Sequence, residues 1–285
     1  MNDILGIDLL RTFAVIAEVG TLSRAAARIG RTQAAISLQV QRLERLVGHP
    51  LLERTGRGVL LTPHGTRLLA HAQRILQYHD EALADLSGRG LSGTIRFGCP
   101  DDYAVRFLPP LLREFARVHP KVHVEVHCAH TPRLLERLEQ HALDLALTSF
   151  AEHDKGRAII RREPLVWVGA DGSGAAHLEP LSLALTDPDT LDHRAARRSL
   201  DDAGRPYRVA YASASLAGLT AVVRSGQAIA VLTRTAVPDD LRVLSAESGL
   251  PALPGVGIGL TVDSKQPSAL VRAFARHVRQ VLPTL

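Results

Sequence analysis

A glycine turn between two helix-forming segments, within residues 21–48, constrains the fold of this chain more than any other feature. The first segment is short, rich in alanine and preceded by Thr21, a residue type that caps helices. Gly30 ends this segment with a tight turn, and Thr32 caps the longer segment that follows. Small side chains in the first segment let another helix approach closely. The pattern predicts a helix-turn-helix.

The flanking residues extend this motif to a winged fold. Asp8 is predicted to cap a preceding helix. Residues 50–62 contain two short apolar runs about a Gly-Arg-Gly turn, which indicates a hairpin, the wing. Thr62 followed by proline is a strong helix start. We therefore expect a winged helix-turn-helix at residues 1–62 and a linker helix at residues 63–87.

Basic charge is concentrated at this end of the chain. The whole chain has 34 basic and 29 acidic residues, a net charge of +5. Residues 11–75 contain ten arginines and three glutamates, a net +7, so the remainder carries −2. A basic domain joined to a near-neutral one indicates a reader of polyanions coupled to a second function. A basic face that is merely solvated is the alternative.

The linker helix has apolar positions spaced alternately by four and three residues, which is typical of a coiled coil and predicts dimerisation. His79 lies in this seam, either as a polar residue that sets the register or as a neutral histidine tolerated at its edge. The seam positions are Leu68, Ala72, Ile75, His79, Ala82 and Leu86.

After a hinge at residues 88–93, alternating strand and helix patterns predict an α/β domain at residues 92–285. Two lobes are expected with a ligand between them, the first formed by residues 92–163 and 264–285 and the second by residues 164–263. The predicted strands are 94–99, 122–128, 144–149, 165–169, 228–232 and 256–262, and the predicted helices are 108–118, 133–141, 216–225 and 268–282.

Residues 21–48 resemble the DNA-binding signature of the LysR-type transcriptional regulators. The resemblance implies an α/β protein overall: a mainly α winged helix-turn-helix, a linker helix, and a two-lobed effector domain like the periplasmic binding proteins. It implies a dimer of dimers that binds promoter DNA, responds to a small co-inducer and contacts RNA polymerase. Further matches, specific at the N-terminus and looser after residue 150, lie at residues 51–57, 61–65, 107–115, 119–120, 143–147 and 226–232.

The matched motif implies which side chains contact DNA. Arg31, Arg54 and Arg57 are placed to neutralise phosphates or to enter the minor groove. An apolar stripe at Ile36, Val40, Leu43 and Val47 should face the core, which turns the other side of the same helix toward the major groove. The expected contacts on that helix are Thr32, Gln33, Ala34, Ser37, Leu38, Gln41 and Arg42.

Two positions depart from the family pattern. Ala34 stands where the family often has proline, and Leu38 stands where a polar or basic residue is common. Both place apolar groups on the outer face of the predicted recognition helix. We hypothesise that they contact thymine methyl groups in the major groove. The alternative is that Leu38 packs on the wing or on a neighbouring subunit.

The resemblance also indicates where the effector binds, at strand ends and the helix starts that follow them. Helix starts favour carboxylates or phosphates. Asp101 and Asp102, however, stand where the family often has serine or threonine. A carboxylate facing the cleft would repel an anion and favour a neutral or cationic ligand, whereas the alternative is that it only caps the next helix. The candidates are Pro100, Asp101, Asp102, Thr131, Ser149 and Phe150, with Ser213 and Ser215 across the cleft.

Cysteine and histidine residues near two strand ends allow further readings. Cys99 and Cys128 end strands that could be neighbours, so a redox pair like that in one branch of the family is an alternative to small buried residues. His123, His127, Cys128 and His130 invite a metal site, but the spacing matches no known ligand set. We expect neither a metal nor another cofactor.

Other functional classes are disfavoured by the sequence. It has no Gly-x-Ser-x-Gly, Walker or His-Glu-x-x-His motif, so no enzyme is expected. The glycines at residues 255–259 lack the spacing of a dinucleotide fingerprint. A solute-binding or redox-sensing protein with a DNA-binding extension is the second hypothesis. The lack of an export signal, of a stretch of about 20 apolar residues and of many cysteines favours a cytoplasmic protein.

Overall fold

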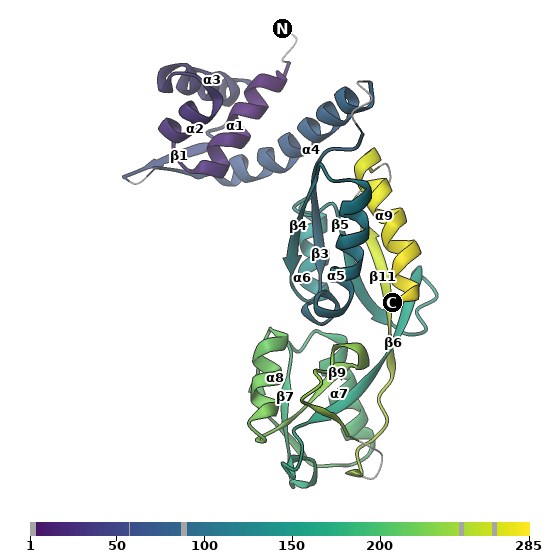
Figure 1. Cartoon of the computed structure of the whole chain (residues 1–285). Coiled ribbons are helices and arrows are strands. Elements are labelled where there is room, and N and C mark those ends of the chain that lie inside the picture. The colour runs from purple at the N-terminus through teal and green to yellow at the C-terminus, as the bar shows by residue number, and fades with distance from the viewer. Residues whose placement is uncertain (1–3, 57, 87–89, 245–247, 264–266) are drawn as a thin grey trace. The chain divides into compact units, whose positions relative to one another are not determined.

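The computed structural model describes residues 4–56, 58–86, 90–244, 248–263 and 267–285. The chain forms two compact units (Figure 1). One consists mainly of the residues up to Thr94, and the other contains Ile95–Glu139, Leu143–Pro267 and Val271–Leu285. The predicted hinge at residues 88–93 lies partly outside the described residues.

The first unit is a winged helix-turn-helix, as predicted. The backbone N–H of Arg24 donates to Thr21 Oγ1 (3.3 Å), and that of Ala35 donates to Thr32 Oγ1 (3.2 Å). Both threonines therefore cap helices. Gly30 adopts the left-handed conformation that ends the first of these helices. The elements are α1 (Ile7–Val19), α2 (Leu22–Ile29), α3 (Gln33–Val47), β1 (Leu52–Thr55), β2 (Gly58–Leu61) and α4 (Pro63–Leu86).

The cap predicted at Asp8 is wrong. Helix α1 begins one residue earlier, with Gly6 as its N-cap, and Asp8 lies in the first helical turn. A carboxylate there interacts favourably with the helix dipole instead of accepting a capping hydrogen bond. The buried stripe of α3 is confirmed for three positions and is only partial at Val47.

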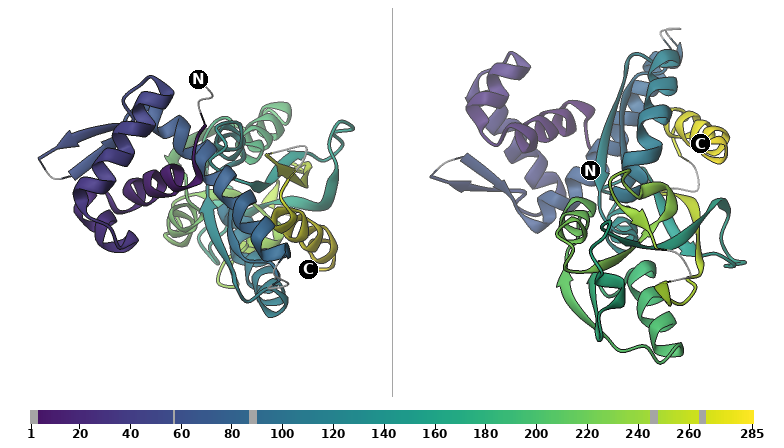
Figure 2. Two further views of the ribbon diagram at one scale, coloured as in Figure 1. Left: turned by 90° about the horizontal axis from the view of Figure 1, so that it is seen from above. Right: turned by 60° about the horizontal axis from the view of Figure 1, so that its bottom comes forward.

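The wing is held against the helices by backbone groups. The N–H of Val59 donates to the carbonyl of Gly20 (2.9 Å), and Glu44 Oε1 accepts from the N–H of Leu51 (2.8 Å). Strands β1 and β2 pair antiparallel and project from the helices of this unit (Figure 2). One of these bonds thus fixes the wing to the turn between α1 and α2, and the other fixes the chain before the wing to α3.

Helix α4 starts at Pro63 as predicted, because Thr62 Oγ1 accepts from the N–H of Gly65 (2.9 Å). The residues of the predicted seam fall into two groups, an earlier one that is buried within this unit and a later one that is exposed. Ala72 is buried in a cluster with residues of α1, whereas Ile75 is 39% exposed and Leu86 is 86% exposed. Only the later part of the seam is thus available to another chain.

The second unit is built on a mixed sheet. Its strand order is β4, β3, β5, β11, β6, β9, β7, β8, with β10 paired to β6. Strands β3 and β5 are parallel, as expected of an α/β unit, while β11 is antiparallel to both of its neighbours. The strands are β3 (Gly93–Cys99), β4 (Val122–Cys128), β5 (Leu145–Ala151), β6 (Ile159–Gly169), β7 (Leu181–Leu185), β8 (Tyr207–Ala212), β9 (Ile229–Thr233), β10 (Arg242–Val243) and β11 (Gly255–Val262).

Helices of the second unit differ from the prediction in two places. Helix α5 starts at Asp101, seven residues before the predicted start, and it includes Pro109 and Pro110 in its interior. Helix α7 and the strands β7, β8 and β10 were not predicted from the sequence. The helices are α5 (Asp101–Val118), α6 (Thr131–Glu139), α7 (Leu191–Asp202), α8 (Leu216–Arg224) and α9 (Ala269–Val281), with short 3₁₀ turns at Ala175–His177, Arg234–Ala236 and Leu282–Thr284.

Strand β6 connects two lobes of this unit. Its first half pairs with β11 up to Pro164, and its second half pairs with β9 from Leu165 onward. The predicted boundary at residue 164 falls at this change of partner. Strand β11 pairs with β5 from Val256 to Val262, so the sheet pairing differs from the prediction, which put this strand with residues 164–263.

The glycines of β11 have a packing role. A Cβ on Gly257 would lie 2.6 Å from Ile159 Cδ1, and one on Gly259 would lie 2.8 Å from Phe150 Cε2. The side chains of Ile159 and Phe150 thus lie directly against this strand, and they would have to move if either glycine carried a Cβ. Among the helices that the structure describes, none is both long enough and apolar enough to cross a membrane.

Candidate DNA-binding surface and effector pocket

The first candidate site is the outer face of α3. Leu38 is 63% exposed although the same helix buries Ile36 and Leu43 completely. Its side chain therefore belongs to no core within this unit, and the proposed packing of Leu38 on the wing finds no support among the described contacts. Around it, the exposed side chains at the start and along the outer face of the helix are Arg31, Thr32, Gln33, Ala34, Gln41 and Arg42.

The wing contributes one arginine to this face. Arg54 of β1 donates through Nη2 to Ser37 Oγ of α3 (3.2 Å), in an exposed hydrogen bond. The guanidinium is thereby placed next to the outer face of α3. The third predicted arginine, Arg57, lies outside the described residues.

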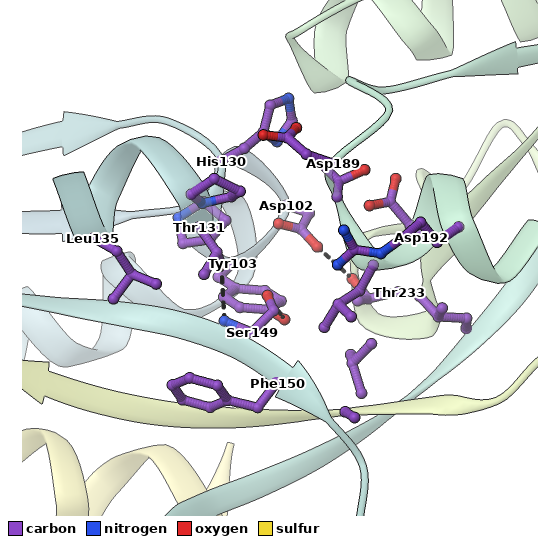
Figure 3. Close-up of a pocket in the computed structure, with 18 of the residues that line it drawn as sticks. Asp102, Tyr103, His130, Thr131, Leu135, Ser149, Phe150, Asp189, Asp192 and Thr233 are labelled. Atoms are coloured by element: carbon purple, nitrogen blue, oxygen red, sulfur yellow. Dashed lines mark hydrogen bonds between the residues drawn. The ribbon is translucent and has the colours of Figure 1, made fainter. Parts of the chain in front are cut away.

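The second candidate site is a cavity of about 470 Å³ between the two lobes (Figure 3). Strand ends and helix starts surround it, as the sequence predicts for an α/β domain. It is lined by Pro100, Asp102, Tyr103, His130, Thr131, Pro132, Leu135, Ser149, Phe150, Ala151, Asp154, Arg157, Leu165, Asp189, Thr190, Leu191, Asp192, Arg194, Thr233 and Val256.

A chain of hydrogen bonds fixes the wall formed by the first lobe. Ser149 Oγ lies 2.7 Å from the hydroxyl of Tyr103, and its backbone N–H donates to Thr131 Oγ1 (2.9 Å). Tyr103 is buried, and burial raises the pKa of its phenol well above the usual value, so the group stays neutral. Beside this wall, the guanidinium of Arg157 lies 4.9 Å from the ring centre of Phe150.

The start of α7 forms the wall of the second lobe. Thr190 caps this helix and its hydroxyl lies 2.6 Å from Thr186 Oγ1. Thr186 Oγ1 also donates to Asp192 Oδ2 (2.5 Å), and its carbonyl lies 2.9 Å from His193 Nδ1. This network orients the Asp192 carboxylate at the pocket edge.

Asp102 connects the lobes across the pocket. The hydroxyl of Thr233, at the end of β9, donates to Asp102 Oδ2 (3.0 Å; Figure 3). Burial and, to a smaller extent, the negative charge of Asp192 together raise the pKa of Asp102 to about 7, although hydrogen bonds from Thr233 and from backbone N–H groups oppose the rise. A carboxylate thus faces the pocket while it also accepts bonds at the start of α5.

Six of the eight predicted effector residues cluster here, although only five line the cavity. Asp101 lies next to the pocket and interacts with Cys128 instead. Ser213 and Ser215 are not among the lining residues. Ser215 caps α8, and Ser213 Oγ donates to its carbonyl (3.3 Å), so both are engaged in the local turn.

The second-lobe residues of the pocket were missed because α7 was not predicted. The signal was present in the sequence. Residues 181–185 form an apolar run that ends in Thr186, followed by residues 187–190 before the helix. This is the same strand-end and helix-start arrangement that located Thr131 and Ser149.

The two cysteines end neighbouring strands, as predicted, but differ in exposure. Cys99 is buried and Cys128 is exposed, so the expectation of a small buried residue holds only for Cys99. Burial raises the pKa of both thiols, and Asp101 adds to the rise at Cys128. These surroundings disfavour the thiolate form. Among the described residues, no group of three His, Cys, Asp or Glu side chains is arranged to hold a metal.

Comparison with known families matches both units. Residues 7–66 match the bacterial regulatory helix-turn-helix protein, lysR family, and residues 88–283 match the LysR substrate binding domain. The HTH-type transcriptional regulator DgdR of Burkholderia cepacia is 63% identical over 281 residues, which cover 99% of this chain and 96% of that protein. PecT of Dickeya dadantii is 36% identical over 270 residues, covering 95% and 85%.

Solved structures share the fold. ArgP from Mycobacterium tuberculosis superposes with a TM-score of 0.67 at 18% identity, covering 97% of each chain. Full-length CbnR, solved in complex with its target DNA, gives a TM-score of 0.65 at 22% identity, covering 97% of this chain and 99% of that one.

The matched families are regulators, not enzymes, and they combine a DNA-binding domain with an effector-binding domain. The predicted fold class and function are therefore confirmed. With both family matches and a relative of high identity along its length, this chain belongs to the LysR family of bacterial helix-turn-helix transcriptional regulators.

Proposed function

We propose that this regulator reads promoter DNA with the outer face of α3 and the wing, and that the pocket between the lobes holds its effector. The observation that supports the DNA surface best is Leu38, a large apolar side chain 63% exposed among polar residues at the centre of that face. Arg54, hydrogen-bonded to Ser37, supplies a phosphate anchor at its edge. Arg57 is expected to act similarly on the wing.

The effector site is proposed from the cavity and its wall. Thr131, Ser149 and Phe150 come from the first lobe, with Pro100 and Asp102 at the start of α5. Asp102 also bonds to Thr233 of the second lobe, so a ligand that engages this carboxylate changes a contact between the lobes. Closure of the lobes around a ligand is expected to shift the arrangement of subunits on DNA.

The assembly is proposed to be a homotetramer that acts in the cytoplasm and contacts RNA polymerase. Apolar side chains late in α4 support self-association, because Ile75 and Leu86 are exposed in the single chain and lie in the predicted seam. Ala82 and His79 continue this seam.

Leu38→Arg tests the proposed reading of the bases. Removing an apolar contact with a thymine methyl and adding a base-reading guanidinium should change the preferred base at one position in each half-site, with a discrimination of about 1–3 kcal/mol. The measurement is binding-site selection with wild type and variant at the same salt concentration. Arg276→Lys, on the exposed face of α9 in the effector domain, serves as a control that keeps its charge. An unchanged preference for Leu38→Arg would exclude a contact between Leu38 and a base.

Ile75→Glu tests the proposed self-association. A carboxylate in an apolar seam between two helices should shift the sedimentation profile toward smaller species by at least tenfold in dissociation constant, about 1.4 kcal/mol. Gln73→Glu, on a different face of α4, is the matched control. Equal oligomer distributions for the two variants would place the subunit interface elsewhere.

A further inference from the structure

The effector pocket carries more negative than positive charge. Four carboxylates and two guanidinium groups line it, a formal balance of −2. The two guanidinium groups are exposed, and one of them is placed over the ring of Phe150. A small cavity with this balance favours positive charge in a ligand. The charged groups are Asp102, Asp154, Asp189, Asp192, Arg157 and Arg194.

Two of the carboxylates come from opposite lobes and repel each other. Asp102 lies in the first turn of α5 in the first lobe and Asp192 in the first turn of α7 in the second, and the negative charge of Asp192 raises the pKa of Asp102. Each side chain is partly buried and already held in place by one threonine hydroxyl. Two oriented, partly buried carboxylates are unfavourable together when both are ionised, and either protonation of one or a positive charge between them relieves the repulsion.

An anionic ligand would find the helix starts already occupied. Asp102 lies in the first turn of α5 and Asp192 in the first turn of α7, where their charges interact with the helix dipoles. Only α6 brings a start without an acidic residue to the pocket, at Thr131 and Pro132. The protein's own carboxylates thus already occupy two of the three helix starts at the pocket, where an anionic ligand would otherwise bind.

The wall of the pocket also contains a buried polar atom that has no hydrogen-bond partner among the described residues. That atom is Nε2 of the His130 ring. His130 lines the pocket on the side of Asp189 and Asp102 (Figure 3). An imidazole ring nitrogen that carries no proton accepts a hydrogen bond, and an ammonium group offers three donors and no acceptor.

We propose that the pocket binds a small ligand carrying a protonated amine, with the amine held between Asp102 of α5 and Asp192 of α7. The assignment rests on the proposed function, in which this pocket is the effector site. An ammonium group between the two carboxylates removes their repulsion and attracts both lobes to one point. Effector binding and lobe closure are then the same event.

A set of four-carbon compounds tests this charge preference with little change in size: n-butylamine, 2-aminobutyrate, butyrate and 1-butanol. Ligand binding to the folded state raises the unfolding midpoint of the full chain, followed by fluorescence of Trp167 in β6. At constant ionic strength and about pH 8, where Asp102 is ionised, the two amines should raise the midpoint and the other two compounds should not. Comparing n-butylamine with 2-aminobutyrate shows whether a carboxylate on the ligand is recognised too.

Variants then locate the amine. Asp102→Asn and Asp192→Asn should each raise the dissociation constant for the amines by about tenfold to a hundredfold, since each removes a charge-assisted hydrogen bond. Asp202→Asn, the same change at the far end of α7, should leave it unchanged. Each ligand-induced shift is referred to the unliganded midpoint of the same variant.

Stabilisation by butyrate alone, no stabilisation by either amine, or equal amine binding by the Asp102→Asn/Asp192→Asn double variant would overturn the assignment. Binding-site selection with the same protein preparation separates this from the proposed function. Retained DNA sequence preference with no amine binding overturns only the ligand class, whereas absence of sequence preference overturns the proposed function itself.

Discussion

Asp102→Asn should stabilise the effector domain at about pH 8 by about 2–4 kcal/mol, while leaving its stability near pH 4 almost unchanged. Burial raises the pKa of Asp102 to about 7, so the folded chain holds this proton more tightly than the unfolded chain, whose carboxyl titrates near its ordinary value of 3.8. As the pH rises from about 4 to about 7, the unfolded state loses the proton first and wild-type stability falls. Asparagine has no proton to lose.

The measurement is urea unfolding of the full chain at a series of pH values. The chain has one tryptophan, and Trp167 lies in the core of the second lobe, where its Nε1 donates to the carbonyl of Pro251 (2.8 Å). Its fluorescence therefore reports on this domain. Asp202→Asn is the control, and parallel pH profiles for wild type and Asp102→Asn would contradict the assigned environment. Other charged or titratable groups that line the pocket with Asp102 are Tyr103, His130, Asp154, Arg157, Asp189, Asp192 and Arg194.

Asp144→Ala should destabilise the effector domain by about 3–5 kcal/mol. Asp144 accepts from the backbone N–H of Arg96 (2.7 Å) and from its Nη2 (2.8 Å), and the side chains are only 7% and 11% exposed. Its removal leaves a buried guanidinium without this counter-charge and a strand N–H without its acceptor. Much of the cost arises because the largely buried guanidinium of Arg96 loses the carboxylate that compensates for its desolvation.

An exposed ion pair in the same domain provides the contrast for this experiment. Arg198 and Asp202 lie 3.8 Å apart on α7, with both side chains at least 75% exposed. Arg198→Ala should therefore change stability by no more than about 0.5 kcal/mol. Urea unfolding followed by circular dichroism compares the two variants, and a loss below about 1 kcal/mol for Asp144→Ala would show that Arg96 is solvated in the folded chain.

The helix-turn-helix could be predicted closely because its signals are local. Thr21 and Thr32 each accept a hydrogen bond from the backbone N–H three residues later, which caps a helix start. Gly30 adopts the left-handed conformation that ends a helix. Each signal acts within one helical turn. Asp8 shows the limit of such signals. A carboxylate is favourable both as a cap and in the first turn, so the residue type does not fix the first helical residue.

Helix α7 escaped prediction because its buried face is small. That face consists of two alanines, one leucine and His193, while arginine and aspartate cover the rest. Such a helix has a weak apolar periodicity, although it packs against a fully buried strand. The start of α5 was misplaced for another reason, since Pro109 and Pro110 are typical of a helix start but lie in its interior here.

The residues of the candidate sites were likewise predictable where a local pattern marks them and not predictable where they depend on an unrecognised element or a long-range contact. Residues of the first-lobe wall, such as Thr131 and Ser149, could be predicted from strand ends, while Asp192 depended on a helix that was not recognised. Which carboxylate faces the cavity could not be known from sequence, because Asp101 and Asp102 are adjacent and point to different neighbours. The contact between Asp102 and Thr233 joins residues 131 positions apart, and no local pattern encodes it.

Binding-site selection from genomic fragments, with the purified full chain at fixed salt, tests the central claim most directly, because DNA affinity depends steeply on salt. The account predicts enrichment of a palindromic site with thymine opposite adenine about one helical turn apart. Weak binding that varies with salt and shows no sequence preference would contradict the assignment of α3 and the wing as a specific DNA reader.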